Sequence, residues 1–419
     1  MKNLFLSVIV AGATVLCGAA TLEQVSVRQA WPWNAKVIIA YNLTLGEGEG
    51  PNDVTVTIKD GSGATVVSDA KAFSGDLSEV GTGAHTICWD PAKAGLSKQP
   101  EFLYFTLTAE ADEKRYCVID ISDTENHQYS VSYLSVMPAA TWPQDCLTTK
   151  IVFRHIKPGT FMMNAPETET GYRATTIGND VAETRHQVTL TKGFYIGVFP
   201  LTHIQSRNVV PDIGSKPGWY TDTMVAMDLS FNQMMGASES AAWCSAPMPE
   251  EGSFIHTLAS RITTGSLPEG MHLSLPTEAQ WEYACRAGTD AAYNDGSGCA
   301  SAEDVQDLAL DALGVYGKYM GHSPAGEGYS VTVDALKPNA WGLYAFHGFA
   351  REWVLDGHGL FSAAAVTDPF VATTLWPVIR GGAYNAKAAD CRCSSRCYRT
   401  RSNGGWDVGA RLAIIPNWN

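Results

Sequence analysis

Hydrophobic and polar residues alternate along the first third of the chain. Short runs rich in β-branched and aromatic residues recur there, at residues 36–41, 54–58, 85–89, 102–108 and 116–119. The Asp60-Gly61-Ser62-Gly63 stretch between two of them is typical of a hairpin turn. Because no helical spacing interrupts the alternation, we predict an all-β sandwich of immunoglobulin or fibronectin type over residues 21–138.

The pattern changes after a predicted linker at residues 139–150. Strand-like apolar runs at 150–156 and 186–197 flank a polar loop, and residues 277–287 have the features of a helix. Thr277 and Gln280 can form a capping box there, Trp281 and Cys285 are four residues apart on one face, and Gly288 follows as a stop signal. Much of the remainder is rich in glycine, proline and asparagine, which predicts long irregular segments.

The first 20 residues are typical of a signal peptide. Lys2 supplies the positive charge, residues 4–16 are apolar, and Gly18-Ala19-Ala20 offers small side chains for cleavage near Ala20. The apolar run is too short to span a bilayer, and no second run of membrane length follows. We therefore expect a secreted or periplasmic protein.

Composition narrows the class of partner. The chain has 419 residues, a net charge of −14 and 17% charged residues, with 45% hydrophobic residues. This hydrophobic content is that of a globular chain long enough for two domains. Nucleic-acid binding requires clustered positive charge, so we expect no nucleic-acid partner.

Nine cysteines remain beyond the predicted signal peptide: Cys88, Cys117, Cys146, Cys244, Cys285, Cys299, Cys391, Cys393 and Cys397. In an oxidising compartment they favour disulfides, and the odd number leaves at least one thiol over. Cys88 and Cys117 are candidates for a bridge between the sheets of the sandwich, although spacing alone does not fix the pairing.

Several ordered motifs in the C-terminal two thirds carry a resemblance. They are FMM at 161–163, HQVTL at 186–190, FYI at 194–196, LPTEAQWEYACRAG at 275–288, KPNAWGLY at 337–344, EW at 352–353 with Asp356, and RGG at 380–382. Through them, residues 151–419 resemble the formylglycine-generating-enzyme family, also called sulfatase-modifying factors. The resemblance implies an α+β domain of C-type-lectin-like fold with little regular secondary structure.

The same resemblance implies a copper site, which this chain alters. In the family's enzymes, two cysteines five positions apart after Arg-Gly-Gly-Ser bind copper(I) and oxidise a sulfatase cysteine with O₂. Counted from Arg380, the second cysteine is Cys391, but the first falls on Ala386 and the serine on Ala383. Paired thiolates suit copper(I), so we expect a non-catalytic domain. The alternative is a copper-dependent formylglycine-generating oxidase in which Cys391 is catalytic and a neighbour substitutes for Ala386.

Two structural features are also implied by the resemblance. In the family, the helix cysteine, here Cys285, bridges to the C-terminal segment, where Cys393 or Cys397 can serve it. The family also holds a structural calcium with an asparagine, which Phe349 replaces here. Calcium needs oxygen ligands, so Glu352 is left as the candidate for a weakened site. Under the non-catalytic hypothesis we expect no cofactor.

Side chains in the C-terminal segment offer candidates for ligand binding. Crowded cations can bind an anionic or glycan ligand, and the candidates are Arg392, Arg396, Arg399, Arg401 and Trp406. The alternative is that the arginines pair with internal acids such as Asp390, Asp407 and Glu282, which is the commoner fate in a polar network. For the non-catalytic domain as a whole, we expect an extracellular glycan or protein as the ligand.

One further set has metal-binding residue types, namely His347, Glu352, Asp356 and His358. Its spacing matches no zinc helix and no facial triad, so buried polar roles are favoured.

Overall fold

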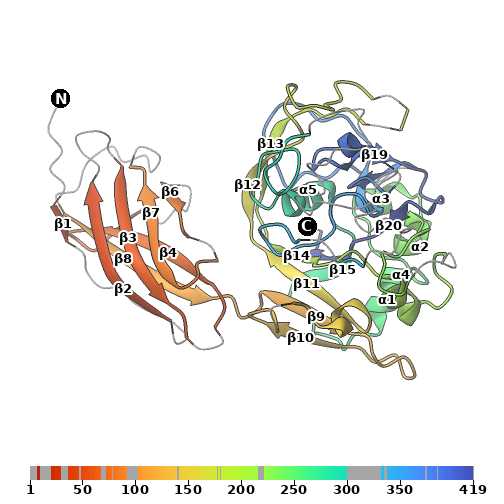
Figure 1. Ribbon diagram of the computed structural model, residues 1–419, viewed down its shortest axis with the longest axis horizontal. Helices are drawn as coiled ribbons and strands as arrows, with labels where there is room; N and C mark the ends of the chain where they lie inside the picture. Colours follow the sequence, from red (N-terminus) through yellow and green to blue (C-terminus); the bar gives the residue numbers. More distant parts are fainter. Residues whose placement is uncertain are drawn as a thin grey trace. The chain divides into compact units, whose positions relative to one another are not determined.

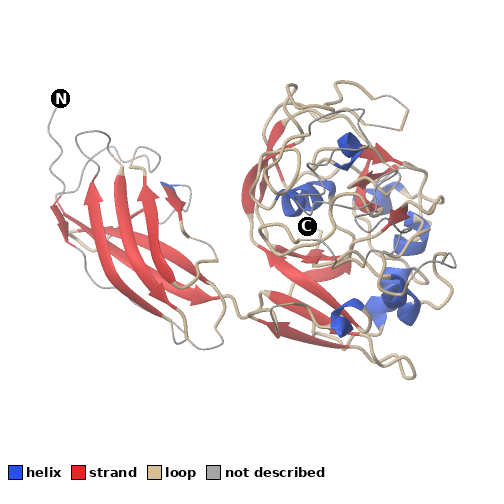
Figure 2. Ribbon diagram, viewed as in Figure 1, coloured by secondary structure: helices blue, strands red, loops and turns tan. Residues whose placement is uncertain are grey.

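A computed structural model of the chain describes residues 7–9, 20–29, 36–46, 49–67, 72–77, 79–91, 102–138, 141–176, 178–179, 181–215, 221–299, 332–334, 337–372, 375–384 and 386–418. The described chain is mostly β, with a few short helices (Figures 1 and 2). It divides into two compact units. The first comprises Met1–Arg115 and Leu134–Pro138, and the second comprises Tyr116–Tyr133 and Ala139–Asn419.

The first unit contains two four-stranded sheets. Their strand orders are β1-β8-β4-β5 and β2-β3-β7-β6. The strands are β1 (Ser7–Ile9), β2 (Thr21–Gln29), β3 (Val37–Thr44), β4 (Asn52–Asp60), β5 (Thr65–Val67), β6 (Phe73–Gly75), β7 (Gly83–Trp89) and β8 (Phe102–Ala111). Their pairing is antiparallel except for that of β1 with β8.

One hydrophobic core joins the two sheets of this unit. Along β3 and β4, every second side chain is buried, as the sequence alternation predicts. Ile39 and Trp89 from one sheet and Ile58 and Phe105 from the other belong to the same buried cluster. The rings of Trp89 and Phe105 meet edge to face, with their centroids 5.9 Å apart. Because one face of each sheet is buried, hydrophobic and polar residues have to alternate along its strands. A register shift of one residue would turn the hydrophobic side chains toward the solvent.

The second unit includes Tyr116–Tyr133, which lie within the range predicted for the sandwich. Strand β9 (Tyr116–Asp120) pairs antiparallel with β11 (Lys150–Ile156), and both belong to the second unit. Most of β9 is buried on both faces. A period-two pattern shows that such a segment is a strand, but it does not show which sheet the strand joins. The predicted linker contains the short 3₁₀ helix η2 (Gln144–Leu147), in which Cys146 and Leu147 are buried.

The second unit contains three sheets. Their strand orders are β10-β9-β11-β14-β21-β15, β12-β13-β17 and β19-β18-β16-β20. The remaining strands are β10 (Ser130–Leu134), β12 (Gly159–Met163), β13 (His186–Leu190), β14 (Phe194–Gly197), β15 (Met271–Ser274), β16 (Arg351–Gly357), β17 (Val366–Thr367), β18 (Pro377–Arg380), β19 (Arg396–Tyr398), β20 (Val408–Gly409) and β21 (Ala413–Pro416). Loops connect them over long stretches, as Figure 2 shows in tan.

The helices of the second unit are short and capped. They are α1 (His203–Val209), α2 (Phe231–Met235), α3 (Ala241–Ser245), α4 (Phe254–Ser260), α5 (Glu278–Arg286) and the 3₁₀ helix η3 (Ala388–Cys391). Thr202, Ser230 and Thr277 each close a capping box at a helix start, which satisfies backbone donors that a short helix leaves free. Within the described ranges, every helix falls short of the length and apolar character needed to cross a bilayer.

Most of the predicted signal peptide lies outside the described residues. Of the part that is described, Ser7–Ile9 form strand β1.

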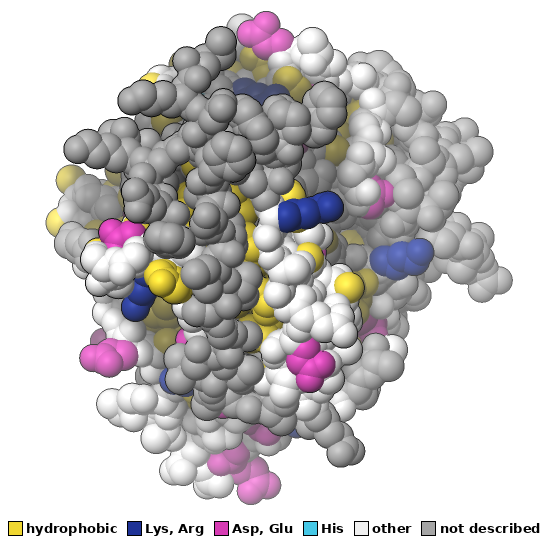
Figure 3. Space-filling model, turned by 90° about the vertical axis from the view of Figure 1, so that its left-hand side faces the viewer, with side chains coloured by type: hydrophobic (Ala, Val, Ile, Leu, Met, Phe, Trp, Pro, Cys, Tyr) yellow, Lys and Arg dark blue, Asp and Glu magenta, His cyan; other side chains and the backbone are white. Residues whose placement is uncertain are grey.

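Charged side chains are spaced apart on the face presented in Figure 3. Lys and Arg (dark blue) and Asp and Glu (magenta) occur there singly among the described residues, with hydrophobic side chains (yellow) between them.

Candidate functional site

Helix α5 lies at the centre of the candidate site. It begins after Thr277, whose hydroxyl accepts from the Gln280 N–H, and it ends at Ala287 in the left-handed conformation at φ 46°. Every α5 side chain except that of Tyr283 is buried, so the helix runs through the interior rather than along the surface. Polar side chains on such a helix need internal partners.

Two buried carboxylates of α5 are paired with three guanidinium groups. The Arg380 Nη1 donates to Glu278 at 3.0 Å, and Arg396 donates to both oxygens of Glu278 at 2.6 and 2.8 Å. Arg286 donates to Glu282 at 2.8 Å, and Arg380 donates to the same carboxylate. We call these five residues the α5 ion network. Removing one partner from such a buried network would leave an uncompensated charge.

Two of the predicted ligand-binding arginines lie inside the domain. Arg392 is fully buried and donates to Glu183 and Glu169 at 2.7 Å each, while Arg396 belongs to the α5 ion network. The prediction that these two arginines meet a ligand is therefore wrong for the described structure. The alternative of internal pairing, also considered from the sequence, describes them correctly.

Arg401 and Arg399 differ in exposure. Arg401 is buried, donates to Asn232 at 2.7 Å, and is therefore also removed from a ligand surface. Arg399 is half-buried and shares Asp407 with Arg351. Trp406, the last of the candidates, is 53% exposed and is the one whose side chain is well placed to meet a ligand.

Glu352, the predicted calcium ligand, is occupied by other groups. Its oxygens accept from Arg411 at 2.9 to 3.2 Å and from the Trp281 indole at 2.6 Å. The carboxylate is buried and its charge is matched by one guanidinium. Calcium coordination at Glu352 would require breaking this ion pair, so the calcium prediction does not fit the geometry.

The positions that carry the family's copper chemistry are buried and largely apolar. Ala383 and Ala386 lie inside the domain, and the Ala386 N–H donates to the Ala383 carbonyl at 2.8 Å across a tight turn. Gly382 packs directly on Cys391, since a Cβ at Gly382 would lie 2.6 Å from the Cys391 sulfur. Where the family's first copper ligand would be, this chain has a methyl group.

The surroundings of Cys391 disfavour a thiolate. Burial, together with the nearby Asp390 charge, raises the pKa of the Cys391 thiol to about 12. The Cys299 thiol is also close enough to act on Cys391 electrostatically. Thiolates, rather than thiols, attack substrates and bind metals. Cys391 is therefore held in its unreactive form.

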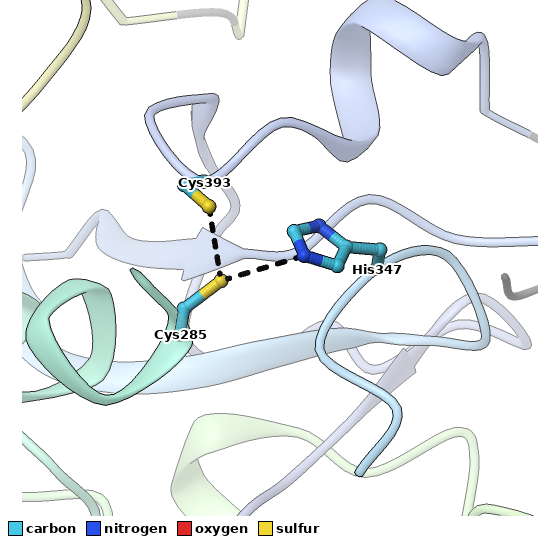
Figure 4. Close-up of side chains that lie close together, drawn as sticks. All are labelled: Cys285, His347 and Cys393. Atoms are coloured by element: carbon cyan, nitrogen blue, oxygen red, sulfur yellow. Dashed lines mark hydrogen bonds between the residues drawn. The ribbon is translucent and has the colours of Figure 1, made fainter. Parts of the chain in front are cut away.

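A second group of sulfurs lies two residues further along the chain. The Cys285 thiol of α5 donates to the Cys393 sulfur at 3.5 Å and lies 3.9 Å from Nε2 of His347 (Figure 4). The three side chains are buried, and their candidate ligand atoms all lie within 4.8 Å of one another. Figure 4 shows that a helix and two separate loops bring them together. We call these residues the Cys₂His cluster.

The two thiols of the cluster differ in acidity. Burial opposes ionisation of Cys393, but the hydrogen bond from the Cys285 thiol and the nearby Arg286 charge hold the pKa of the Cys393 thiol well below its usual value. Burial raises the pKa of Cys285 well above its usual value, and the hydrogen bond to Cys393 adds to the effect. Cys393 is therefore the more acidic thiol of the pair.

The disulfide predictions do not hold in this structure. None of the nine described cysteines from Cys88 onward forms a disulfide. Cys88 and Cys117 belong to different compact units, which removes the predicted bridge within the sandwich. Cys397 lies at the surface of β19 rather than beside Cys285, whereas the Cys285 and Cys393 sulfurs are adjacent but 3.5 Å apart, against about 2.05 Å for a bond.

No pattern along the chain indicates the part that His347 plays. It was grouped there with Glu352, Asp356 and His358, but His358 packs on Tyr398 instead. His347 meets the two thiols from a loop that is 62 residues from Cys285. Such long-range placement follows from the tertiary fold, and no residue spacing encodes it.

An aromatic surface lies beside strand β19. Tyr398 contacts His358 and Trp376, with ring centroids 4.4 and 5.5 Å apart, and Trp376 is 39% exposed. The neighbouring Leu360 and Leu375 are 74% and 50% exposed. Backbone hydrogen bonds from His358 to Trp376 and from Arg401 to Leu375 hold these segments side by side. We call His358, Leu360, Leu375, Trp376 and Tyr398 the aromatic surface.

Two curated enzymes are similar to part of this chain. A formylglycine-generating enzyme of Mus musculus is 29% identical over 147 residues, covering 33% of this chain and 38% of that protein. The corresponding enzyme of Thermomonospora curvata is 30% identical over 155 residues, covering 34% of this chain and 49% of that protein. The matches thus span less than half the length of these curated relatives.

Among solved structures, Treponema denticola variable protein 1 is similar, with a TM-score of 0.45 and 19% identity over 64% of this chain and 96% of that one. The decisive match is to a family rather than to one protein. Residues 139–415, more than half of the chain, match the sulfatase-modifying factor enzyme 1-like domain. The chain therefore belongs to the family of this domain, also called the formylglycine-generating-enzyme family.

Proposed function

We propose that this chain has lost the formylglycine-generating activity of its family and binds an extracellular ligand, a glycan or a protein. The observation that carries the proposal is the methyl group of Ala386, which stands where the family has its first copper ligand. Copper(I) in such a site needs a pair of thiolates. Here one thiol of that pair is absent, and the other, Cys391, is buried.

Neighbouring groups do not supply the missing ligand. Among the described residues, the metal-competent cluster of three or more groups is Cys285, His347 and Cys393, and it does not include Cys391. Ala383 also lacks the hydroxyl that the family's serine provides. The family's copper therefore does not fit these residues, and we derive no oxidation step through it.

The aromatic surface is the best-supported place for a ligand. Its exposed rings suit stacking on the flat face of a sugar, and its exposed leucines suit an apolar protein surface. Of its residues, Tyr398 in β19 lies in the C-terminal segment that the sequence suggested for recognition. Trp406 adds a further exposed ring in that segment.

An activity measurement tests the loss of catalysis. The full chain is incubated with a cysteine peptide from a sulfatase, copper(I) and O₂, and the aldehyde product is counted by mass spectrometry. We expect no product above a no-protein blank, with an active formylglycine-generating enzyme as the positive control. Copper-dependent aldehyde formation that disappears in Cys391→Ser would overturn the proposal.

A binding measurement tests the ligand site. The full chain is applied to immobilised glycans and to extracellular proteins, alongside a Trp376→Ala/Tyr398→Ala variant. We expect binding to fall at least about tenfold, because exposed Trp and Tyr side chains commonly dominate such contacts. The matched control is Phe370→Ala, which changes an aromatic pair with Trp418 in a separate pocket of about 190 Å³. Equal binding by the double variant would exclude the aromatic surface.

The second candidate function is the copper-dependent formylglycine-generating oxidase. In this alternative Cys299, which is near enough for its charge to act on Cys391, would substitute for the missing thiol. A Cys299→Ser variant separates the two functions. Loss of both copper binding and aldehyde product in this variant would establish the oxidase.

For the first unit, we propose an immunoglobulin- or fibronectin-like module that acts as a spacer or in adhesion. Its two sheets around one core support this assignment.

We also propose an extracytoplasmic location after cleavage near Ala20, based on the charge and apolar run of the N-terminal sequence. Sequencing the N-terminus of the exported protein would test the cleavage site.

A further inference from the structure

The Cys₂His cluster has the composition of a soft-metal site. Thiolate sulfur and imidazole nitrogen together select copper(I) or zinc, whereas oxygen ligands select calcium or magnesium. Around a metal with bonds of about 2.3 Å to sulfur, two sulfurs lie roughly 3.8 to 4.0 Å apart. The Cys285 and Cys393 sulfurs are 3.5 Å apart, so a shift of a few tenths of an ångström would suffice.

The histidine of the cluster is oriented for binding. Its Nδ1 lies 2.6 Å from the Cys391 carbonyl oxygen, so Nδ1 carries the proton and donates it there. Nε2 then keeps its lone pair, and it lies 3.9 Å from the Cys285 sulfur. Metal-binding histidines usually have their other ring nitrogen fixed in this way. Nε2 also accepts a long 3.4 Å contact from the Asn294 N–H, which metal binding would release.

Each member of the cluster is held by its own support. The Cys393 N–H donates to the Ala292 carbonyl at 2.8 Å, and the Cys393 carbonyl accepts from Arg380 at 2.7 Å. Cys285 is in α5, and its carbonyl accepts from the Asn339 side chain at 3.2 Å. The Tyr293 ring packs edge-on against His347, with centroids 5.5 Å apart. Preorganised ligands of this kind reduce the ordering that metal binding would otherwise require.

Coordination number distinguishes the two candidate metals. The cluster offers three ligand atoms among the described residues, all within 4.8 Å of one another. Three buried ligands match the low coordination number that copper(I) accepts, whereas structural zinc takes four.

We propose that Cys285, His347 and Cys393 form a buried copper(I)-binding site. It uses none of the positions, 386 and 391, that hold copper in the family's enzymes. Each ligand binds through one atom, namely the two Sγ atoms and Nε2. Loading displaces the protons that the two thiols carry, and the metal stays copper(I), so no redox step is involved.

The test measures copper(I) binding by the reduced full chain under anaerobic conditions, in competition with a chromogenic copper(I) chelator. We expect one copper per chain. Affinity should fall more than about 100-fold in Cys285→Ser and Cys393→Ser, because outer-shell partners alone are worth about 10- to 100-fold. Copper X-ray absorption should show two sulfur neighbours and one nitrogen neighbour, and His347→Ala should remove the nitrogen.

Matched controls keep the outcome decisive. Cys397→Ser changes a half-buried thiol four residues after Cys393 and should bind copper as the wild type does. Circular dichroism confirms that each serine variant is folded. Wild-type affinity in folded Cys393→Ser, dependence on Cys391 instead, binding of zinc(II) but not copper(I), or no binding by the reduced protein would each overturn the proposal.

Discussion

Two cysteines that are two residues apart in the chain have opposite surroundings. Cys391 falls on the second copper-ligand position that the resemblance implies, where the first position is Ala386, and Gly382 packs against the Cys391 sulfur. Cys393 contacts a second thiol and belongs to a cluster with His347. A family motif indicates which positions carry the chemistry in relatives. Only the side-chain contacts in this structure show which possible ligand atoms lie close together in this chain.

Breaking the α5 ion network, which supports the segment of Cys393, should have the largest effect on the free energy of unfolding. Arg380 pairs with Glu278 and Glu282 and also donates to the Cys393 carbonyl. In Arg380→Met the two buried carboxylates lose a partner, so we expect a loss of about 3–5 kcal/mol in unfolding free energy. Chemical denaturation measures it.

The control for this variant is Arg399→Met, which removes a half-exposed partner of Asp407. Arg351 still pairs with Asp407 in this variant, so it should lose much less stability than Arg380→Met. Equal stability of Arg380→Met and Arg399→Met would show that the α5 ion network does not hold the region of Cys393.

The free energy of unfolding should depend on the protonation of Asp356, which accepts from the Glu278 N–H at the start of α5 at 2.7 Å. Burial and the Glu278 charge raise its pKa from 3.8 to about 7. The folded state therefore binds this proton more tightly than the unfolded state does. Its stabilising effect is full below about pH 4 and is lost as the pH rises to about 7, a change on the order of a few kcal/mol.

The measurement is unfolding free energy against pH for the wild type and Asp356→Asn. We expect the variant to lose the decline between pH 4 and 7. Asp212→Asn changes a fully exposed side chain and should keep the wild-type slope. An unchanged slope in Asp356→Asn would show that this carboxyl does not control the pH dependence.

A smaller effect should come from Gly382→Ala, which tests how tightly Cys391 is enclosed. Gly382 has φ +67°, and an added Cβ would lie 2.6 Å from the Cys391 sulfur and 2.8 Å from the Asp390 carbonyl oxygen. Strain and overpacking together should cost about 1–3 kcal/mol. Gly288→Ala, at φ +92° with open space around it, isolates the backbone cost alone. If the two variants lose the same stability, the contact with Cys391 is loose.

The smallest effect on the fold comes from thiol labelling, which leaves the native state intact. In native protein at pH 8, iodoacetamide should modify the half-buried Cys88, Cys244 and Cys397 within minutes. Cys391 should stay unmodified, because burial raises its pKa to about 12 and leaves it a thiol. Peptide mass spectrometry reads each site. Modification of Cys391 at the rate of Cys397 would show that it is accessible.

Part of this architecture could be predicted from sequence. The capping box at Thr277 and the stop before Gly288 predicted α5, and the structure confirms a helix at Glu278–Arg286. The alternation in the first unit likewise predicted its strands. Helices α1 to α4 span five to seven residues each, which is too short for a periodic pattern to be recognised.

Only those site positions that the family motif specifies could be predicted from the sequence. Aligning the motif at Arg380 identifies Ala383 and Ala386 as the replaced serine and cysteine. The internal pairing of Arg392 and the meeting of His347 with Cys285 depend on segments that are 209 and 62 residues apart, respectively. Contacts at such separations are set by how the sheets and loops pack, and a single sequence contains no pattern for them.

The most direct test is anomalous diffraction at the copper edge from crystals of the full chain loaded anaerobically with copper(I). We predict one anomalous peak within bonding distance of the Cys285 and Cys393 sulfurs and His347 Nε2, and no peak beside Cys391. A peak bonded to Cys391 would show that the family's copper site survives here, and it would contradict both the proposed loss of activity and the new site.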